Sequence, residues 1–363
     1  MRKLTKTEKN ILQYVFLLFL IGLTVYIVST TIDYRRIPDV IAFVDKKFLF
    51  FGMLLVLIYI ILETLVFQLI INSVEKDKKK RTIGLQMGTM GLYYNLVTPF
   101  ASGSQPMQIY VMNRYGISLS KAVAIVTNKT VLFQTVVTFI CGAVILLNKS
   151  MIVSDYRHII MLLTFGMAMN MVTILGGMMI VLNPKLMKKF VDIVISALGR
   201  FRIFKFLRDK NERCYNYIDD FNKSILMYIK DVKSLIITIF LTFLQLFIYF
   251  SIVFCIYKAS KLSGTSFYML FSLQVLLYMT ISPIPTPGNV GANEITFFGI
   301  FNRVFPKRYI GYAVIMYSFL VYYFILLLSG ICTWISHYYM NKMDEDELRN
   351  IKKESQKIKE SLE

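Results

Sequence analysis

Three ionisable side chains lie inside apolar stretches of the sequence, where charged groups are rare. Two are the carboxylates of Glu63 and Glu294, and the third is the amine of Lys129. An ionisable group at membrane depth pairs with another charge or binds a charged substrate. Glu294 has a second interpretation of equal weight, because it follows a turn and can cap its own helix, where the dipole favours negative charge. For Lys129, ligand binding and pairing with a carboxylate both stay open.

Polar side chains gather at two interruptions that are rich in proline and glycine. Arg114 and Lys121 follow the first interruption, and cations that face a cavity suit a phospholipid phosphate. The alternative for these two residues is ordinary contact with the membrane interface. The predicted substrate-binding residues are Ser104, Gln105, Arg114, Asn128, Lys129, Asn289, Asn293 and Glu294.

The sequence has no pattern typical of a catalytic or metal centre. It contains two histidines, no HExxH motif, no P-loop and no Ser-His-Asp set with a recognisable spacing. The four cysteines are far apart in the chain, which favours neither disulfides nor metal ligands. We therefore predict no catalytic residue, no metal and no cofactor.

The composition is that of an integral membrane protein. Of 363 residues, 56% are hydrophobic and only 17% are charged, and the mean hydropathy is +0.57, whereas a soluble domain carries about a quarter of its residues as charges. The net charge of +19 would suggest nucleic acid in a soluble protein. In a membrane protein, basic loops fix orientation and contact anionic lipid, so no direct nucleic-acid binding is expected.

Eight apolar stretches build the predicted fold. Six are predicted full spans, at residues 11–31, 48–71, 121–147, 159–182, 234–256 and 309–335. Two more, at residues 82–116 and 267–303, are interrupted and read as broken-helix pairs. The residues that break them are Pro99, Gly103, Pro106, Pro285, Pro287, Gly288 and Gly291.

Basic clusters at residues 2–9, 76–81 and 185–233 should face the cytoplasm, as should both termini. With that topology the two interrupted stretches are re-entrant hairpins that enter from opposite sides. We predict an all-α integral membrane protein with six full spans, two opposed re-entrant hairpins and an inverted repeat, which is typical of transporters. Full-depth hairpins that give ten spans, and simple proline kinks between packed helices, are the alternatives.

Two segments resemble a known family: residues 98–106 (TPFASGSQP), followed by Tyr110 and residues 114–116 (RYG), and residues 285–294 (PTPGNVGANE). Together they resemble the lysylphosphatidylglycerol synthase/flippase transmembrane family, the membrane half of the multiple peptide resistance factor. The resemblance implies a multi-pass protein of the bacterial plasma membrane that handles phospholipid. It also implies a transmembrane lipid-handling domain at residues 1–336, with halves of about 1–182 and 234–336, a basic cytoplasmic linker at 183–233 and a charged cytoplasmic tail at 337–363.

The sequence departs from that family at two places. Residues 103–106 (GSQP) stand where the family commonly has Gly-Gly-Glu-Pro, and Asn128 and Lys129 stand near a Glu-Arg pair. The loss of both acids favours an anionic or neutral lipid over a cationic lysyl headgroup.

The leading functional hypothesis is a translocase or binding protein for phosphatidylglycerol or an aminoacylated derivative, linked to resistance to cationic antimicrobial peptides. The alternative is a phosphatidylglycerol lysyltransferase that uses lysyl-tRNA, either directly or as the membrane subunit of a split synthase with a separate cytosolic enzyme. The tail after residue 336 is expected to be too short to hold a transferase domain. A third reading is a scaffold for a separate lipid enzyme.

Overall fold

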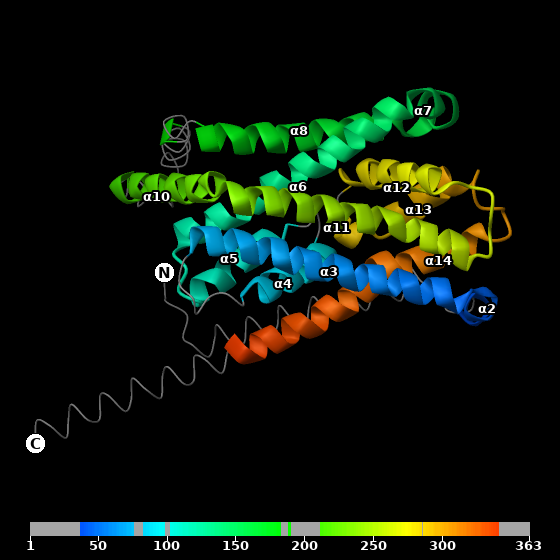
Figure 1. Ribbon diagram of the computed structural model, residues 1–363, viewed down its shortest axis with the longest axis horizontal. Coiled ribbons are helices and arrows are strands. Elements are labelled where there is room, and N and C mark those ends of the chain that lie inside the picture. The colour runs from blue at the N-terminus through cyan, green and yellow to red at the C-terminus, as the bar shows by residue number, and fades with distance from the viewer. Residues whose placement is uncertain are drawn as a thin grey trace, which may run out of the picture.

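The computed structural model describes residues 37–75, 83–98, 102–182, 188–189, 211–284 and 286–340. Within these ranges the regular secondary structure is entirely helical. Most of the long helices run along one direction of the molecule, with α3 and α11 side by side near its centre (Figure 1). The prediction of an all-helical protein is therefore confirmed for this part of the chain.

Five helices in the described ranges are long and apolar enough to cross a membrane. They are α3 (Lys46–Val74), α6 (Leu119–Leu147), α8 (Ile160–Leu182), α11 (Val232–Ala259) and the helix that begins as α14 (Ile310–Ser318) and continues to Met340. Each coincides with a predicted span. The remaining predicted span, at residues 11–31, lies outside the described residues. These helices make the chain a multi-pass membrane protein.

Both interrupted stretches form two helices each. The first consists of α4 (Ile83–Val97) and α5 (Ser104–Arg114). The second consists of α12 (Phe267–Ile281) and α13 (Ala292–Phe301), with a single 3₁₀ turn between them at Pro287–Asn289. Breaks therefore occur where proline and glycine predict them, while the re-entrant topology and the inverted repeat stay predictions.

The described structure also contains the α-helices α2 (Ile37–Phe43), α7 (Lys149–Asp155) and α10 (Asn211–Lys230), and a 3₁₀ turn at Arg157–Ile159. Helix α10 lies in the predicted basic linker and packs Phe221 and Ile225 against α6. Asp231 separates it from α11 and caps the latter, accepting a hydrogen bond from the Ser234 N–H at 3.2 Å. Hydrogen bonds from Ser234 and Ser73 hold the pKa of the Asp231 carboxyl below its usual value.

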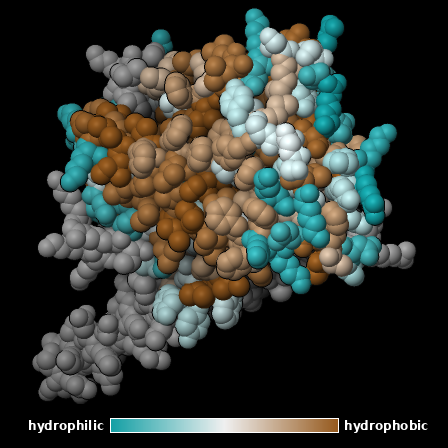
Figure 2. All heavy atoms as spheres, turned by 45° about the vertical axis from the view of Figure 1, so that its right-hand side comes forward, coloured by the Kyte–Doolittle hydropathy of each residue, from teal (hydrophilic) through white to brown (hydrophobic). Residues whose placement is uncertain are grey.

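Large apolar side chains cover much of the outer surface. Figure 2 shows a broad brown area on one face, with hydrophilic side chains gathered toward its edges. Phe50, Phe139, Met161 and Phe240 are among the exposed residues, each more than 60% accessible. Exposure of this extent is expected where lipid replaces water as the solvent.

Two glycines let α4 lie close against α3. A Cβ atom at Gly88 would lie 2.8 Å from Thr64 Cγ2 and 3.0 Å from Thr64 Cα, and one at Gly84 would lie 2.5 Å from Gln68 Cβ. Small residues at such contacts are typical of membrane helix pairs.

We expect Gly88→Leu to lower the free energy of unfolding by about 1 to 3 kcal/mol, because the new side chain meets backbone that cannot give way. Denaturant unfolding of the purified protein measures the change. Gly142→Leu is the control, since a Cβ there meets nothing within 4 Å. Equal stability of the two variants would contradict the close contact between α3 and α4.

Candidate functional site

A cavity of about 380 Å³ lies between the two helix interruptions. Its wall includes residues from both of them, such as Ser104 and Gln105 from the first and Gly288, Asn289 and Asn293 from the second. Helices α3, α6, α11 and α12 supply most of the rest, through side chains that include Glu63, Lys129, Tyr249 and Tyr278. Segments far apart in the sequence thus enclose one polar space inside a membrane domain.

The Thr98 side chain satisfies backbone groups on both sides of the first interruption. Its hydroxyl donates to the Tyr94 carbonyl at 2.6 Å and accepts from the Gly103 N–H at 2.9 Å. Free backbone groups are costly in hydrocarbon, so a helix break survives where such partners exist. Beyond the break, Ser104 is buried in the cavity wall while Gln105 is exposed and donates to Thr130 at 3.3 Å. The cavity therefore reaches the protein surface between α5 and α6.

The second interruption uses left-handed backbone and a carboxylate cap. Gly288, Asn289 and Gly291 have φ of 56°, 57° and 82°, a region that glycine and asparagine tolerate best. Glu294 accepts hydrogen bonds from the Gly291 N–H and from the Ser318 hydroxyl, both at 2.6 Å. Both carboxylate oxygens are therefore engaged within the protein, as the capping interpretation predicts.

The two interruptions touch at Gly288. A Cβ atom there would lie 2.1 Å from the Tyr322 ring and 2.9 Å from the Leu96 carbonyl oxygen, at the end of α4. Tyr322 belongs to a π-helical segment, Phe319–Tyr323, that follows α14. Its hydroxyl also points at the Leu96 carbonyl, at 3.5 Å. π-Helical turns of this kind are frequent at functional sites, and here one packs where the two breaks meet.

A buried ion pair lies in the cavity wall. Lys129 Nζ on α6 is 2.5 Å from Glu63 Oε1 on α3, and the two side chains are 17% and 5% exposed. Gln245 of α11 donates to the other carboxylate oxygen at 2.8 Å. The Lys129 ammonium also lies over the Phe133 and Phe67 rings, 5.0 Å and 5.2 Å from their centroids. Charge pairing, one of the two interpretations of Lys129, is thus observed, and the pair faces the cavity.

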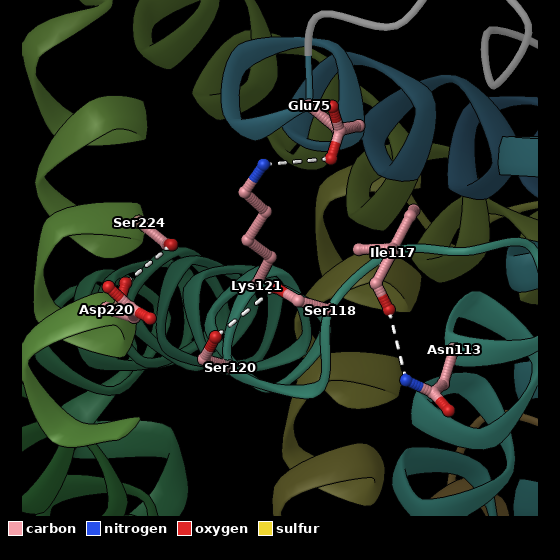
Figure 3. A network of polar contacts seen from close by, with 8 residues as sticks. All are labelled: Glu75, Asn113, Ile117, Ser118, Ser120, Lys121, Asp220 and Ser224. Carbon is pink, nitrogen blue, oxygen red and sulfur yellow. Dashed lines mark hydrogen bonds and ion pairs between the residues drawn. The ribbon is translucent and has the colours of Figure 1, made fainter. Parts of the chain in front are cut away.

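The same two helices carry a second ion pair near one end of the bundle. Lys121 Nζ is 3.0 Å from Glu75 Oε2, and Figure 3 shows this pair beside the turn that leads from α5 into α6. At about 1.5 Å of rise per residue, Lys129 lies about 12 Å further along α6, and Glu63 about 18 Å further along α3. The Glu63–Lys129 pair is therefore the deep one and Glu75–Lys121 the peripheral one.

The structure brings five of the eight predicted binding residues into the cavity wall: Ser104, Gln105, Lys129, Asn289 and Asn293. The other three lie outside it. Glu294 caps α13; Arg114 Nη1 donates to the Tyr110 hydroxyl at 3.0 Å; and Asn128 is buried on α6, where its Nδ2 has no hydrogen-bond partner among the described residues. Of the predicted breaking residues, Pro99 and Pro285 fall outside the described ranges.

Sequence reasoning missed Gln245 and the cavity tyrosines Tyr59, Tyr249 and Tyr278. Gln245 is fully buried in the middle of α11, and a lone amide within an apolar run was a usable signal. The tyrosines gave no such signal, because 23 tyrosines occur along the chain. The depth of Glu63 follows from the sequence, whereas its partner on α6 does not, because spacing along one helix does not identify a residue on another.

The cavity combines one carboxylate and one ammonium with several amides and hydroxyls. Amide oxygens accept hydrogen bonds and amide N–H groups donate them, and Asn293 Oδ1 is buried with no partner in the described part of the chain. Such a set suits recognition of a polar group that carries charge. Among the described lining residues there is neither histidine nor cysteine.

Of three comparisons with known proteins, one gives a match. Searches of curated proteins and of solved structures give no significant match. The profile of the family described as "Lysylphosphatidylglycerol synthase TM region" matches residues 10–329. Since that match covers most of the chain, including both interruptions, the protein belongs to the lysylphosphatidylglycerol synthase transmembrane family.

Proposed function

We propose that this protein binds a membrane phospholipid and moves its headgroup across the bilayer through the cavity between the two helix interruptions. The observation that carries the proposal is the cavity itself, a polar space of about 380 Å³ in a membrane domain, lined by both broken segments. Membership of a lipid-handling family supports the same reading. The headgroup occupies the cavity while the acyl chains stay in the bilayer.

The lining residues suit a phosphate-bearing headgroup. Lys129 supplies a positive charge, and Gln105, Asn289 and Asn293 supply amides that donate to phosphate oxygens or glycerol hydroxyls. Gln105 lies at the surface and Lys129 deeper, so the headgroup passes from α5 and α6 inward. Broken helices at the middle of a membrane domain serve the same purpose in many transporters.

We also propose a cellular location, a membrane topology and a domain division for this protein. The protein acts in the bacterial plasma membrane with both termini in the cytoplasm, and the two interrupted segments are re-entrant hairpins of an inverted repeat. Residues 1–336 form the lipid-handling domain, and residues 337–363 form a cytoplasmic tail. When the lipid is an aminoacylated phosphatidylglycerol with one ammonium group, its arrival in the outer leaflet makes the outer surface less negative, which links the protein to resistance against cationic antimicrobial peptides.

A cavity-blocking substitution tests the proposal. In liposomes that contain the purified protein and a phospholipid labelled on one acyl chain, we expect Thr130→Trp to slow lipid movement at least about tenfold, which corresponds to a loss of about 1.4 kcal/mol of binding free energy. Thr130 lies in the cavity wall next to Gln105, so an indole there occupies the entrance. A reagent that destroys label in the outer leaflet measures the rate.

Thr135→Trp is the matched control. Thr135 is exposed on the same helix but is not part of the cavity wall, so this variant should move lipid at the wild-type rate. Equal rates for both variants, with equal amounts of folded protein, would remove the cavity from the transport path. Absence of any lipid movement by the wild-type protein would reject the translocase itself.

The family description names a synthase, which keeps phosphatidylglycerol lysyltransferase as the second candidate. Incubation of the purified protein with lysyl-tRNA and phosphatidylglycerol, followed by lipid extraction, distinguishes the two. Formation of lysylphosphatidylglycerol without a partner protein supports the lysyltransferase. Formation only after a separate cytosolic synthase is added supports a split enzyme.

A further inference from the structure

We infer that the headgroup bound in the cavity is zwitterionic, with one phosphate and one ammonium group, and that Lys129 and Glu63 recognise the two charges. This inference rests on the proposed function and names the substrate class of the same site. It starts from the ion pair in the cavity wall, in which Lys129 Nζ lies 2.5 Å from Glu63 Oε1.

The charge of the cavity is balanced before a lipid enters. Among the described lining residues, Glu63 and Lys129 carry the formal charges, one of each sign, and the other side chains are neutral. An anionic headgroup would leave the cavity with net charge −1, and a headgroup with two ammonium groups and one phosphate would leave it at +1. An unbalanced charge is costly where protein and lipid, rather than bulk water, surround most of it. A zwitterion keeps the sum at zero.

Binding of a zwitterion is an exchange of partners. The lipid phosphate takes the place of Glu63 beside Lys129, and the lipid ammonium takes the place of Lys129 beside Glu63. Each protein charge therefore keeps an opposite charge nearby throughout. No bond is made or broken, and no proton has to move.

The surroundings of the pair allow this exchange. Gln245 holds the second oxygen of Glu63 at 2.8 Å, so the carboxylate stays in place when Lys129 leaves it. Lys129 has a flexible stem of four methylene groups, and the Phe67 and Phe133 rings lie beside its ammonium. On the carboxylate side, Tyr59 and Tyr278 line the same cavity as Glu63. Aromatic faces are favourable neighbours for an incoming ammonium group.

The test compares two lipids of equal chain length that differ in headgroup charge. Dioctanoyl phosphatidylethanolamine is zwitterionic and dioctanoyl phosphatidylglycerol is anionic, and their binding to the purified protein in neutral detergent is measured by calorimetry. We expect the wild-type protein to bind the zwitterion at least about tenfold more tightly. The reason is that its ammonium group makes a hydrogen bond to the Glu63 carboxylate that phosphatidylglycerol cannot make.

Glu63→Gln should invert this preference. The variant keeps the shape of the side chain but gives the cavity a net charge of +1, so phosphatidylglycerol becomes the tighter ligand. The double variant Glu63→Gln/Lys129→Met has a neutral cavity without the pair and should bind both lipids weakly, with a ratio near one. Glu75→Gln removes the acid of the peripheral pair, 3.0 Å from Lys121, and should leave the ratio as in the wild type.

A purely structural role for the pair predicts something different. Loss of folded protein lowers the binding of both lipids by the same factor and leaves their ratio unchanged. A wild-type protein that binds phosphatidylglycerol as tightly as phosphatidylethanolamine, or a Glu63→Gln variant that keeps the wild-type ratio, overturns the inference. If the wild-type protein still moves lipid in liposomes, the proposed function stands even though this inference fails. If the wild-type protein neither binds nor moves either lipid, the proposed function fails as well.

Discussion

Lys129→Met should lower the free energy of unfolding by about 3 to 5 kcal/mol and abolish lipid movement, because removing one partner of a buried pair leaves the other charge uncompensated. That remaining charge is Glu63, whose side chain is only 5% exposed. The Gln245 amide still donates to it, but one neutral donor does not replace an ammonium ion. Denaturant unfolding of the purified protein and the liposome assay give the two readouts.

The double variant Glu63→Gln/Lys129→Met separates stability from function. Without either charge, most of the lost stability should return, since a neutral pair of similar size avoids the cost of desolvation. Lipid movement should stay absent because the cavity has lost its phosphate partner. The peripheral variant Lys121→Met is the control, and it should cost about 1 kcal/mol or less, as is usual for partly exposed pairs. Equal losses for Lys129→Met and Lys121→Met would show that the deep pair has no special role.

Gly288→Ala should destabilise the protein by about 2 to 4 kcal/mol and slow lipid movement. Part of this cost, about 1 to 2 kcal/mol, comes from a side chain at φ of +56°. The rest comes from overpacking, because the added Cβ would lie 2.1 Å from the Tyr322 ring and 2.9 Å from the Leu96 carbonyl. Thermal unfolding in detergent and the liposome assay measure both effects.

Gly176→Ala is the matched control for Gly288→Ala. Gly176 lies in α8, and a Cβ there meets nothing within 4 Å, so no loss is expected. The second-site variant Gly288→Ala/Tyr322→Leu should recover part of the stability, since it removes the ring that the new methyl group meets. A Gly288→Ala protein as stable and active as the wild type would show that the two interruptions do not depend on their close approach.

The sequence was sufficient for the elements that hydropathy and backbone chemistry determine locally. Apolar runs at least as long as the bilayer is thick predict spans, and five of the six predicted spans coincide with long helices of the described structure. Proline and glycine clusters predict breaks, and both breaks occur. These features depend on residues within one stretch of chain. The two motifs also placed the chain in its family, which the profile match confirms.

Tertiary structure decided how the polar residues are used. Glu63 and Lys129 are far apart in the sequence. They meet because α3 and α6 pack side by side with these two residues at the same depth. The packing of α11 against α3 gave Glu63 a second partner in Gln245, and the π-helical turn at Phe319–Tyr323 set Tyr322 against Gly288. Spacing along a chain specifies which residues share a helix face, but contact between helices depends on their relative rotation and depth. For that reason the sequence by itself determined the membrane-spanning elements and their breaks, while only the folded structure decided which charges face the cavity.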